Sequence, residues 1–586
     1  MKKNVLALSI AAMIGGLGFA SVASAGVIVG TGAAPAAGGR AVANAMQVPN
    51  ITGFTLAEGG VGHALVVPYY SAQNGNMTVL HVVNTDTKSG KVAKIRFRGA
   101  SNSDDVLDFQ VLLSPGDVWT AAVTKGADGF ANLTTADGAC SIPALQKGVS
   151  VPFLAGRLNP NLTGDALANQ TREGYVEIFN AADIPSDAVY GKTADAQSAL
   201  YTAIKHVNGT APCTSSAIQA ALFNNNFGSL AGDAAAAKLA VEKTAANLGL
   251  DSPTGGLTAD WYIINVPQTT TFSGAATALV GVGGTVGNYV AFPQNDTIKV
   301  ATPELYTADP LLVSKGIAAT SKDNIGAWAA ADGTTAAVVE AIALDFPDMS
   351  TPYYGGYPVA GGQSAASQAA NLTQALAVSS ITNQYAKDAS ITAKTDWVFS
   401  MPTRRYNVAL DYSKQTATQP PARVFSSVSG KVGTTTPVGV AAAANPGAPG
   451  GTQFFYTGNT KVVDGKICVD TQGAVFRDRE ETFKSGIPVF SPSTAKSSRM
   501  CGEANVLSFG EGVANPSVLG ATVAREDVTA ASIYENGWGV LDTTNGGVGL
   551  PIMGYSVIKL SNPQVAAGVS GNFGITWPHR FVKVNP

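Results

Sequence analysis

The sequence predicts a mainly β protein with α-helical insertions, in which antiparallel β-sandwich domains of immunoglobulin-like architecture are joined by Gly/Ala/Thr-rich segments. Short apolar runs recur with turn signals about every 10–12 residues, which is the strand spacing of an antiparallel sandwich. Hydrophobic residues make up 45% of the 586-residue chain, so a sizeable core is available. The chain contains 65 glycines, a share well above the usual ~7%.

The N-terminal 25 residues predict export. Lys2 and Lys3 are followed by an apolar stretch, and Ala23-Ser24-Ala25 offers a small-residue cleavage site. This order of charge, apolar stretch and small residues is typical of a bacterial secretory signal peptide over residues 1–25. We therefore expect a secreted protein of the cell surface, in which residues 26–60 form a Gly/Ala-rich N-terminal arm.

Residues 61–185 predict a β-sandwich. The turn signal at residues 73–76 marks a hairpin, and the alternation resumes over residues 172–179 after the loop that contains Cys140. Five earlier strands are expected over residues 63–70, 77–84, 91–98, 107–113 and 118–124.

The next ranges change character. Residues 186–255 predict an Ala-rich helical insert, with helices over 194–206 and 234–248 and a stop at Gly249. Residues 256–414 predict a mixed β/α region that continues the sheets, with strands over 260–267 and 288–293, helices over 334–346 and 365–378, and a flexible Gly-rich turn over 281–287.

The last third of the chain predicts a second β-rich region. Residues 415–455 form a low-charge linker or loop, and residues 456–586 form the C-terminal β-rich region. Its strands are expected over residues 461–468, 474–479, 501–509, 537–542, 554–559 and 574–584.

The four cysteines predict disulfides. An exported chain meets an oxidising setting, where an even number of cysteines argues for bridges. Three pairings are open, and the simplest joins Cys140 to Cys213 and Cys468 to Cys501, each within its own region. Metal-binding spacing of the C-x₂-C kind is absent.

Charge and motif content exclude several classes of function. The chain has 37 Lys+Arg against 40 Asp+Glu, so no basic excess exists to neutralise a nucleic acid. The sequence has no G-x-S-x-G or H-E-x-x-H motif, and its four histidines are scattered. Glu173 and Glu177 share a strand face at about 13 Å, beyond the ~5–9.5 Å that a glycosidase needs. We therefore expect no enzyme, no nucleic-acid partner and no membrane span.

Two weak sets of candidate ligand residues remain. Asp104, Asp105 and Asp108 offer oxygen ligands for calcium, the cofactor that suits an exported acidic chain, or else they cap turns. Exposed tyrosines on loops could stack on sugar rings, or else they pack at sheet ends. These glycan candidates are Tyr353, Tyr354 and Tyr357, with Tyr69 and Tyr70.

Several blocks together resemble secreted, β-rich bacterial cell-surface proteins of the surface-layer-like type. The resemblance implies a location and a general structural role, and it transfers no catalytic residue. The blocks are residues 65–70, 94–118, 172–180, 396–402, 476–481, 501–509 and 550–554.

These observations favour a structural, self-assembling protein of the bacterial cell surface, such as a surface-layer or extracellular filament subunit. Its partners would be copies of itself, with outer-membrane glycan as a further partner. Only 13% of the residues are charged, so large areas can pack together without burying many ions. The alternatives are an adhesin or glycan-binding surface protein and an extracellular hydrolase.

Overall fold

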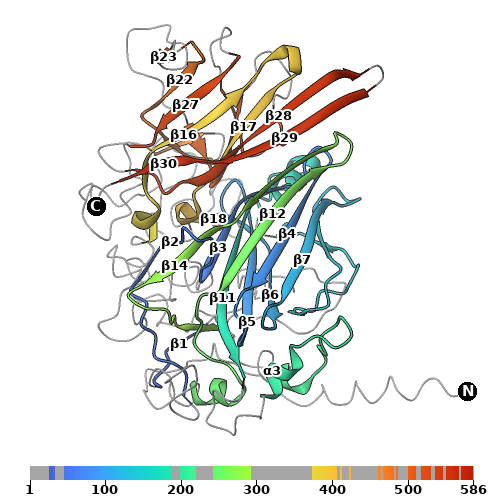
Figure 1. Cartoon of the computed structure of the whole chain (residues 1–586), viewed down its shortest axis with the longest axis vertical. Helices are drawn as coiled ribbons and strands as arrows, with labels where there is room; N and C mark the ends of the chain where they lie inside the picture. The colour runs from blue at the N-terminus through green and yellow to red at the C-terminus, as the bar shows by residue number, and fades with distance from the viewer. Residues whose placement is uncertain are drawn as a thin grey trace, which may run out of the picture.

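The computed structural model shows two β units that follow one another along the long axis of the molecule (Figure 1). The first unit runs from blue to green in Figure 1, and the second runs from yellow to red. The structure describes residues 26–32, 45–156, 158–186, 198–218, 242–291, 372–405, 410–411, 422–423, 460–463, 466–480, 483–485, 499–509, 517–528, 535–544, 549–566 and 569–584.

The first β unit is built from two antiparallel sheets. The seven-stranded sheet has the order β2-β14-β3-β11-β5-β6-β9, and the six-stranded sheet has the order β10-β8-β7-β4-β12-β13. The strands are β2 (Gly53–Leu56), β3 (Ala64–Ser71), β4 (Asn76–Asn84), β5 (Ser89–Gly99), β6 (Asp105–Leu113), β7 (Val118–Lys125), β8 (Ala131–Thr135), β9 (Cys140–Ile142), β10 (Val151–Pro152), β11 (Glu173–Pro185), β12 (Leu257–Asn265), β13 (Thr270–Ala275) and β14 (Thr277–Val282).

The second β unit is built from two five-stranded sheets. The inner sheet, which packs on the first unit, has the order β26-β25-β17-β28-β29, and the outer sheet has the order β23-β22-β27-β16-β30. Only the β25–β26 pair is parallel among these. The strands are β16 (Val378–Ala386), β17 (Lys394–Ser400), β22 (Gly473–Asp478), β23 (Phe483–Ser485), β25 (Ala504–Phe509), β26 (Arg525–Val528), β27 (Asn536–Asp542), β28 (Met553–Ala566), β29 (Val569–Pro578) and β30 (Arg580–Lys583).

Smaller elements surround these four sheets. Strand β1 (Gly26–Ile28) pairs with β15 (Tyr289–Ala291), β18 (Leu410–Asp411) pairs with β19 (Ala422–Arg423), and β20 (Thr460–Val463), β21 (Lys466–Asp470) and β24 (Arg499–Cys501) form a three-stranded sheet. The helices are α2 (Gly164–Arg172), α3 (Ala199–Ala203), α4 (Ser216–Ile218), η5 (Ala389–Ile391) and η6 (Pro402–Arg404).

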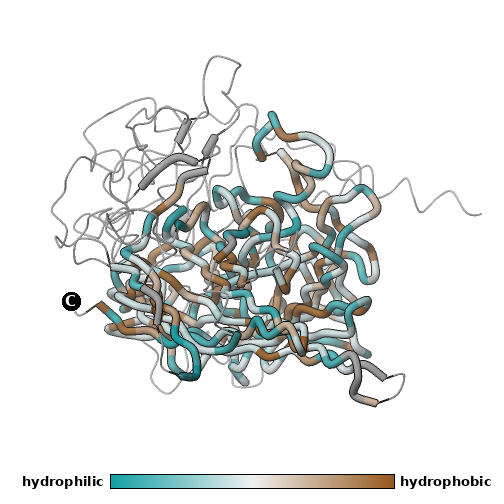
Figure 2. The backbone as a smooth tube through the Cα atoms, turned by 90° about the horizontal axis from the view of Figure 1, so that it is seen from above, coloured by the Kyte–Doolittle hydropathy of each residue, from teal (hydrophilic) through white to brown (hydrophobic). Residues whose placement is uncertain are grey.

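One apolar core joins three of the sheets. Burial alternates strictly along β4, so every second side chain enters this core, as the period of a strand requires. Trp119 and Trp261 come from the six-stranded sheet, and Tyr555 of the inner sheet stacks on Trp261 at 4.3 Å between ring centroids. Figure 2 shows apolar and polar segments following one another along the chain, as alternating strands produce.

A separate aromatic core lies between the inner and outer sheets. Trp397 and Phe509 of the inner sheet contact Tyr385 and Phe476 of the outer sheet, with ring centroids 5.2–6.0 Å apart. Such large buried rings contribute much of the apolar area of a small sandwich core. The second unit therefore has a core of its own.

The several antiparallel sheets confirm the predicted mainly β fold class and are consistent with β-sandwich domains. The five strands expected between residues 63 and 124 are β3 to β7. Strand β11 begins one residue later than the expected strand because Arg172 ends helix α2, which the sequence did not indicate. The strand expected over 461–468 is a hairpin of β20 and β21 instead. The expected Gly-rich turn at 281–287 begins inside β14, which pairs with β2 and β3.

The predicted regions divide differently in space. The range 256–414 contributes β12–β14 to the first unit and β16 and β17 to the second, because its strands pair with partners far away in sequence. The described part of the 26–60 arm is packed on the first unit, since Met46 and Phe54 are apolar and buried there. The helix expected over 194–206 is the short α3, which Ser198 caps at its N-terminus.

Candidate functional site

The candidate functional site lies where the two β units meet, around a loop of residues 517–524 that we call the junction loop. Asp396 of β17 lies buried behind this loop and belongs to the second unit. Its carboxylate accepts hydrogen bonds from Ser517 Oγ at 2.7 Å, Leu519 N at 2.9 Å and Ser508 Oγ at 2.8 Å. Burial raises the pKa of Asp396, and these hydrogen bonds oppose that rise.

The first unit holds the other half of the junction loop through Glu173. This residue begins β11 and is fully buried. Its carboxylate accepts from the backbone N–H groups of Thr522 at 2.7 Å, Val523 at 3.1 Å and Ala524 at 3.2 Å. Gln73 Nε2 donates to the same carboxylate at 2.7 Å. One buried carboxylate from each unit therefore fixes the loop.

A polar cavity of about 570 Å³ opens beside the junction loop. We call it the junction pocket. Its walls come from the β3–β4 turn, the β12–β13 turn, the junction loop and the facing ends of β17 and β28. Its lining residues are Gln73, Asn74, Gln268, Thr392, Lys394, Ser517, Val518, Gly520, Thr522, Lys559 and Ser561.

Glycine is required at one point of this wall. Gly520 has φ +65°, and a Cβ added there would lie 2.5 Å from Asn74 Cβ. Asn76 Nδ2 donates to Leu519 O at 2.6 Å, which holds the loop against the β3–β4 hairpin. The backbone of the junction loop therefore lies close against the β3–β4 hairpin, an approach that leaves no room for a Cβ at residue 520. Side chains of both units line the same cavity.

A second feature is an exposed apolar edge on the second unit. Phe573 and Trp577 of β29 are 55% and 44% exposed, and Phe581 and Val582 of β30 are 46% and 60% exposed. Strand β30 pairs with β16 on one side, and no strand in the described residues pairs with its other side. We call these four side chains and the free side of β30 the apolar edge.

His579 fixes the corner between β29 and β30. Its ring is buried, stacks on Phe399 at 4.7 Å between centroids, and lies 2.8 Å from Val398 O through Nε2. Asn383 Nδ2 donates to Nδ1 at 2.9 Å. Burial lowers the pKa of His579 to about 3, so the imidazole is neutral near pH 7.

An exposed tryptophan marks a third surface feature. Trp538 of β27 is 40% exposed, and the guanidinium of Arg477 lies 5.8 Å from its ring centroid. A cavity of about 540 Å³ beside it is also lined by Asn536 and Arg479. A flat aromatic face beside polar groups suits the stacking of a sugar ring, and sequence reasoning missed it because a lone Trp in a strand carries no motif.

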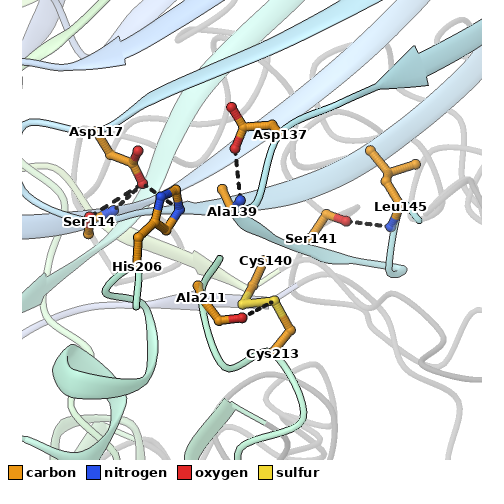
Figure 3. Close-up of a disulfide and its surroundings, with 10 residues drawn as sticks. All are labelled: Ser114, Asp117, Asp137, Ala139, Cys140, Ser141, Leu145, His206, Ala211 and Cys213. Atoms are coloured by element: carbon orange, nitrogen blue, oxygen red, sulfur yellow. Dashed lines mark hydrogen bonds and ion pairs between the residues drawn. A yellow bond between two sulfur atoms is a disulfide. The ribbon is translucent and has the colours of Figure 1, made fainter. Parts of the chain in front are cut away.

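The structure contains both disulfides that the sequence predicts. Cys140 is bonded to Cys213 and Cys468 to Cys501, with Cα atoms 5.2 Å and 4.0 Å apart. Figure 3 shows the first bridge running from β9 to the segment that follows α3. In the same view His206 lies by Asp117, with Nε2 3.6 Å from Oδ2.

The calcium candidates lie beside basic side chains of β5. Asp108 pairs with Lys94, and Asp105 pairs with Arg96 at 3.3 Å, while Asp104 is buried next to them. Burial lowers the pKa of Lys94 to about 8, against the attraction of Asp108. In the described part of the chain, no three Asp, Glu, His or Cys side chains come together as ligands for a metal ion.

Of the five tyrosines predicted as glycan candidates, the structure describes two. Tyr353, Tyr354 and Tyr357 lie outside the described residues. Tyr69 and Tyr70 lie on β3, which has a neighbouring strand on each side, and both side chains are fully buried. They therefore cannot stack on an external sugar.

The two glutamates of β11 have different partners. Glu173 binds the junction loop, whereas Glu177 pairs with Arg98 at 3.3 Å. The prediction that the two glutamates share one strand face assumes a regular strand. Strand β11 is irregular, because its register against β3 shifts between Gly174 and Val176.

No family model, curated protein or solved structure matches the chain. Within the described residues, no helix has the length and apolar character needed to cross a membrane.

Proposed function

We propose that the protein is a structural, self-assembling subunit of the bacterial cell surface, exported by its N-terminal segment, and that copies associate through the apolar edge. The carrying observation is the free side of β30 with Phe581 and Val582 exposed. An edge strand offers unpaired N–H and C=O groups to another chain, and exposed apolar side chains add to that attraction.

Features of the whole chain support the same role. A strand edge that meets a different patch on the next copy gives an open, repeating contact, which is what a layer or filament needs. Charged residues are only 13% of the chain, which lowers the cost of covering wide surfaces. The two disulfides stabilise a subunit outside the cell.

The test is the state of association of the secreted protein with and without the apolar edge. We expect the wild-type protein to form large assemblies in light scattering and regular arrays in electron microscopy. The variant Phe581→Asp/Val582→Asp should remain monomeric at the same concentration, because charge on an edge strand opposes pairing.

The matched control is Val207→Asp/Val266→Asp, which adds the same charge at two other exposed valines, 64% and 70% exposed. It should assemble as the wild type does. A wild-type protein that stays monomeric at millimolar calcium, or an edge variant that assembles normally, would overturn the proposal.

A further inference from the structure

The junction pocket contains a pair of like charges that the fold itself holds together. Lys394 of β17 and Lys559 of β28 are directly opposite one another in the antiparallel register. Side chains in that relation have Cβ atoms about 4.5–5.5 Å apart, and like charges there repel. Both lysines are half-buried and line the cavity.

No described carboxylate neutralises this pair. Lys559 Nζ donates to the neutral Gln268 Oε1 at 2.7 Å, and no acidic side chain is among the lining residues. The two carboxylates that hold the junction loop, Asp396 and Glu173, are buried behind it and accept hydrogen bonds from it. Burial is the larger cause that lowers the pKa of Lys559, and the positive charge of Lys394 lowers it further.

The remaining polar lining is suited to donate hydrogen bonds to an anion. Asn74 and Gln268 carry amide groups, and Ser561 carries a hydroxyl group that can donate. The amide of Gln73 and the other hydroxyl groups already donate within the protein, as Ser517 Oγ does to Asp396, Thr522 Oγ1 to Gly520 O and Thr392 Oγ1 to Ser561 O. Two cationic ammonium groups beside neutral donors form a site that favours negative charge and offers it several hydrogen bonds.

We infer that the junction pocket binds an anionic group, a carboxylate, sulfate or phosphate, between the ammonium groups of Lys394 and Lys559. A ligand held there touches both β units, since Gln73 and Gln268 belong to the first and both lysines to the second. Binding therefore relieves the repulsion between the lysines and ties the units together. This inference is independent of assembly through the apolar edge.

The source of the anion is either a free inorganic ion or an acidic saccharide that carries the same group. Thermal unfolding of the full chain is measured with increasing sodium sulfate, sodium phosphate, glucuronate and a sulfated disaccharide. Each series is compared with sodium chloride of equal ionic strength, which removes general screening. We expect a saturable rise in Tm above the chloride reference, because a ligand that binds only the folded state stabilises it.

Charge removal identifies the site. Lys394→Gln and Lys559→Gln should each weaken anion binding at least tenfold, and the double variant should abolish it. Lys394→Arg/Lys559→Arg, which keeps both charges, should retain binding. The matched control is Lys88→Gln/Lys147→Gln, two exposed lysines of the first unit, which should bind as the wild type does.

The unliganded double variant supplies a second readout. If the lysines serve the ligand, Lys394→Gln/Lys559→Gln should unfold at a Tm equal to or above that of the wild type, because the repulsion is gone. Tighter binding of the saccharides than of the free ions assigns the site to an acidic glycan, and equal binding assigns it to a free anion. No saturable shift with any of the four, binding undiminished in the double variant, or a lower unliganded Tm would each overturn the inference.

Discussion

At the scale of single residues, the buried imidazole of His579 makes the stability of the fold depend on pH. It is neutral in the folded protein, with its pKa lowered to about 3 by burial, and is expected to titrate near 6.5 when the chain unfolds. Between these values the unfolded chain binds a proton that the folded protein does not bind. The contribution of His579 to folding stability therefore rises with pH across this window and is lost as pH falls from about 6.5 towards 3.

We predict that His579→Gln unfolds with a shallower dependence on pH than the wild type between pH 6 and pH 4. The amide keeps a polar group at the corner but cannot gain a proton, so a contribution of about 1.4 kcal/mol per pH unit disappears there. Urea unfolding midpoints at pH 4, 5, 6 and 7 measure the slope. His81→Gln controls for the loss of one histidine, and equal slopes for wild type and His579→Gln would contradict the prediction.

At the scale of elements, the junction loop depends on the Glu173 carboxylate. Three successive backbone N–H groups, those of Thr522, Val523 and Ala524, donate to it. An amide at this position offers one acceptor oxygen and turns an NH₂ group towards the same donors. Buried donors that lose their acceptor each cost about 1–3 kcal/mol.

We predict that Glu173→Gln lowers the free energy of unfolding by about 2–3 kcal/mol and speeds amide hydrogen exchange at residues 522–524. Glu177→Gln is the matched control on the same strand. It breaks the ion pair with Arg98 and should leave exchange in the junction loop unchanged. Equal protection of the loop in wild type and Glu173→Gln would show that other contacts hold it.

Strands with alternating apolar residues could be predicted from the sequence, and β4 and β7 are clear examples. Elements without that signal were missed for physical reasons. The last two residues of β14, Gly281 and Val282, begin a Gly-rich run that indicates a turn, but they pair with β2. Helix α2 begins after Thr163, but its buried residues are Ala168, Thr171 and Arg172, so no periodic apolar face indicates it.

The candidate site could not be predicted from the sequence, because its residues are far apart along the chain. Glu173 lies 349 positions before Thr522, whose N–H it binds, and nothing local to either residue indicates the contact. Lys394 and Lys559 become neighbours only through the register of β17 with β28. Sheet pairing over such separations depends on the packing of the whole molecule, which the local pattern of a strand does not determine.

At the scale of the whole molecule, the two disulfides lie in regions that differ in how much regular secondary structure surrounds the cysteines. The Cys140–Cys213 bridge spans 73 residues and the Cys468–Cys501 bridge spans 33, so each stabilises by about 4 kcal/mol in the loop-entropy description. Cys468 and Cys501 also face each other across the paired strands β21 and β24. Cys213 lies in a segment whose described helices, α3 and α4, are short.

We therefore predict that loss of the first bridge loosens residues 198–218 before any sheet opens. In Cys140→Ser/Cys213→Ser, hydrogen exchange should accelerate in this segment, because its helices are short and depend on tertiary contacts, such as the burial of Leu200 and Ile204 and the hydrogen bond from Ala211 N to Gly138 O at 2.9 Å. Strands β4 and β12 should keep their protection, since their pairing does not involve the bridge.

Cys468→Ser/Cys501→Ser is the matched control, and it should leave exchange at residues 198–218 unchanged. Peptide mapping without reductant establishes the bridges of the starting protein. A linkage between Cys140 and Cys468, or between Cys213 and Cys501, would contradict the arrangement of the two units. Uniform acceleration of exchange in the first variant would instead mean that this segment folds and unfolds together with the first β unit, and that its bridge stabilises the sheets as much as the helices.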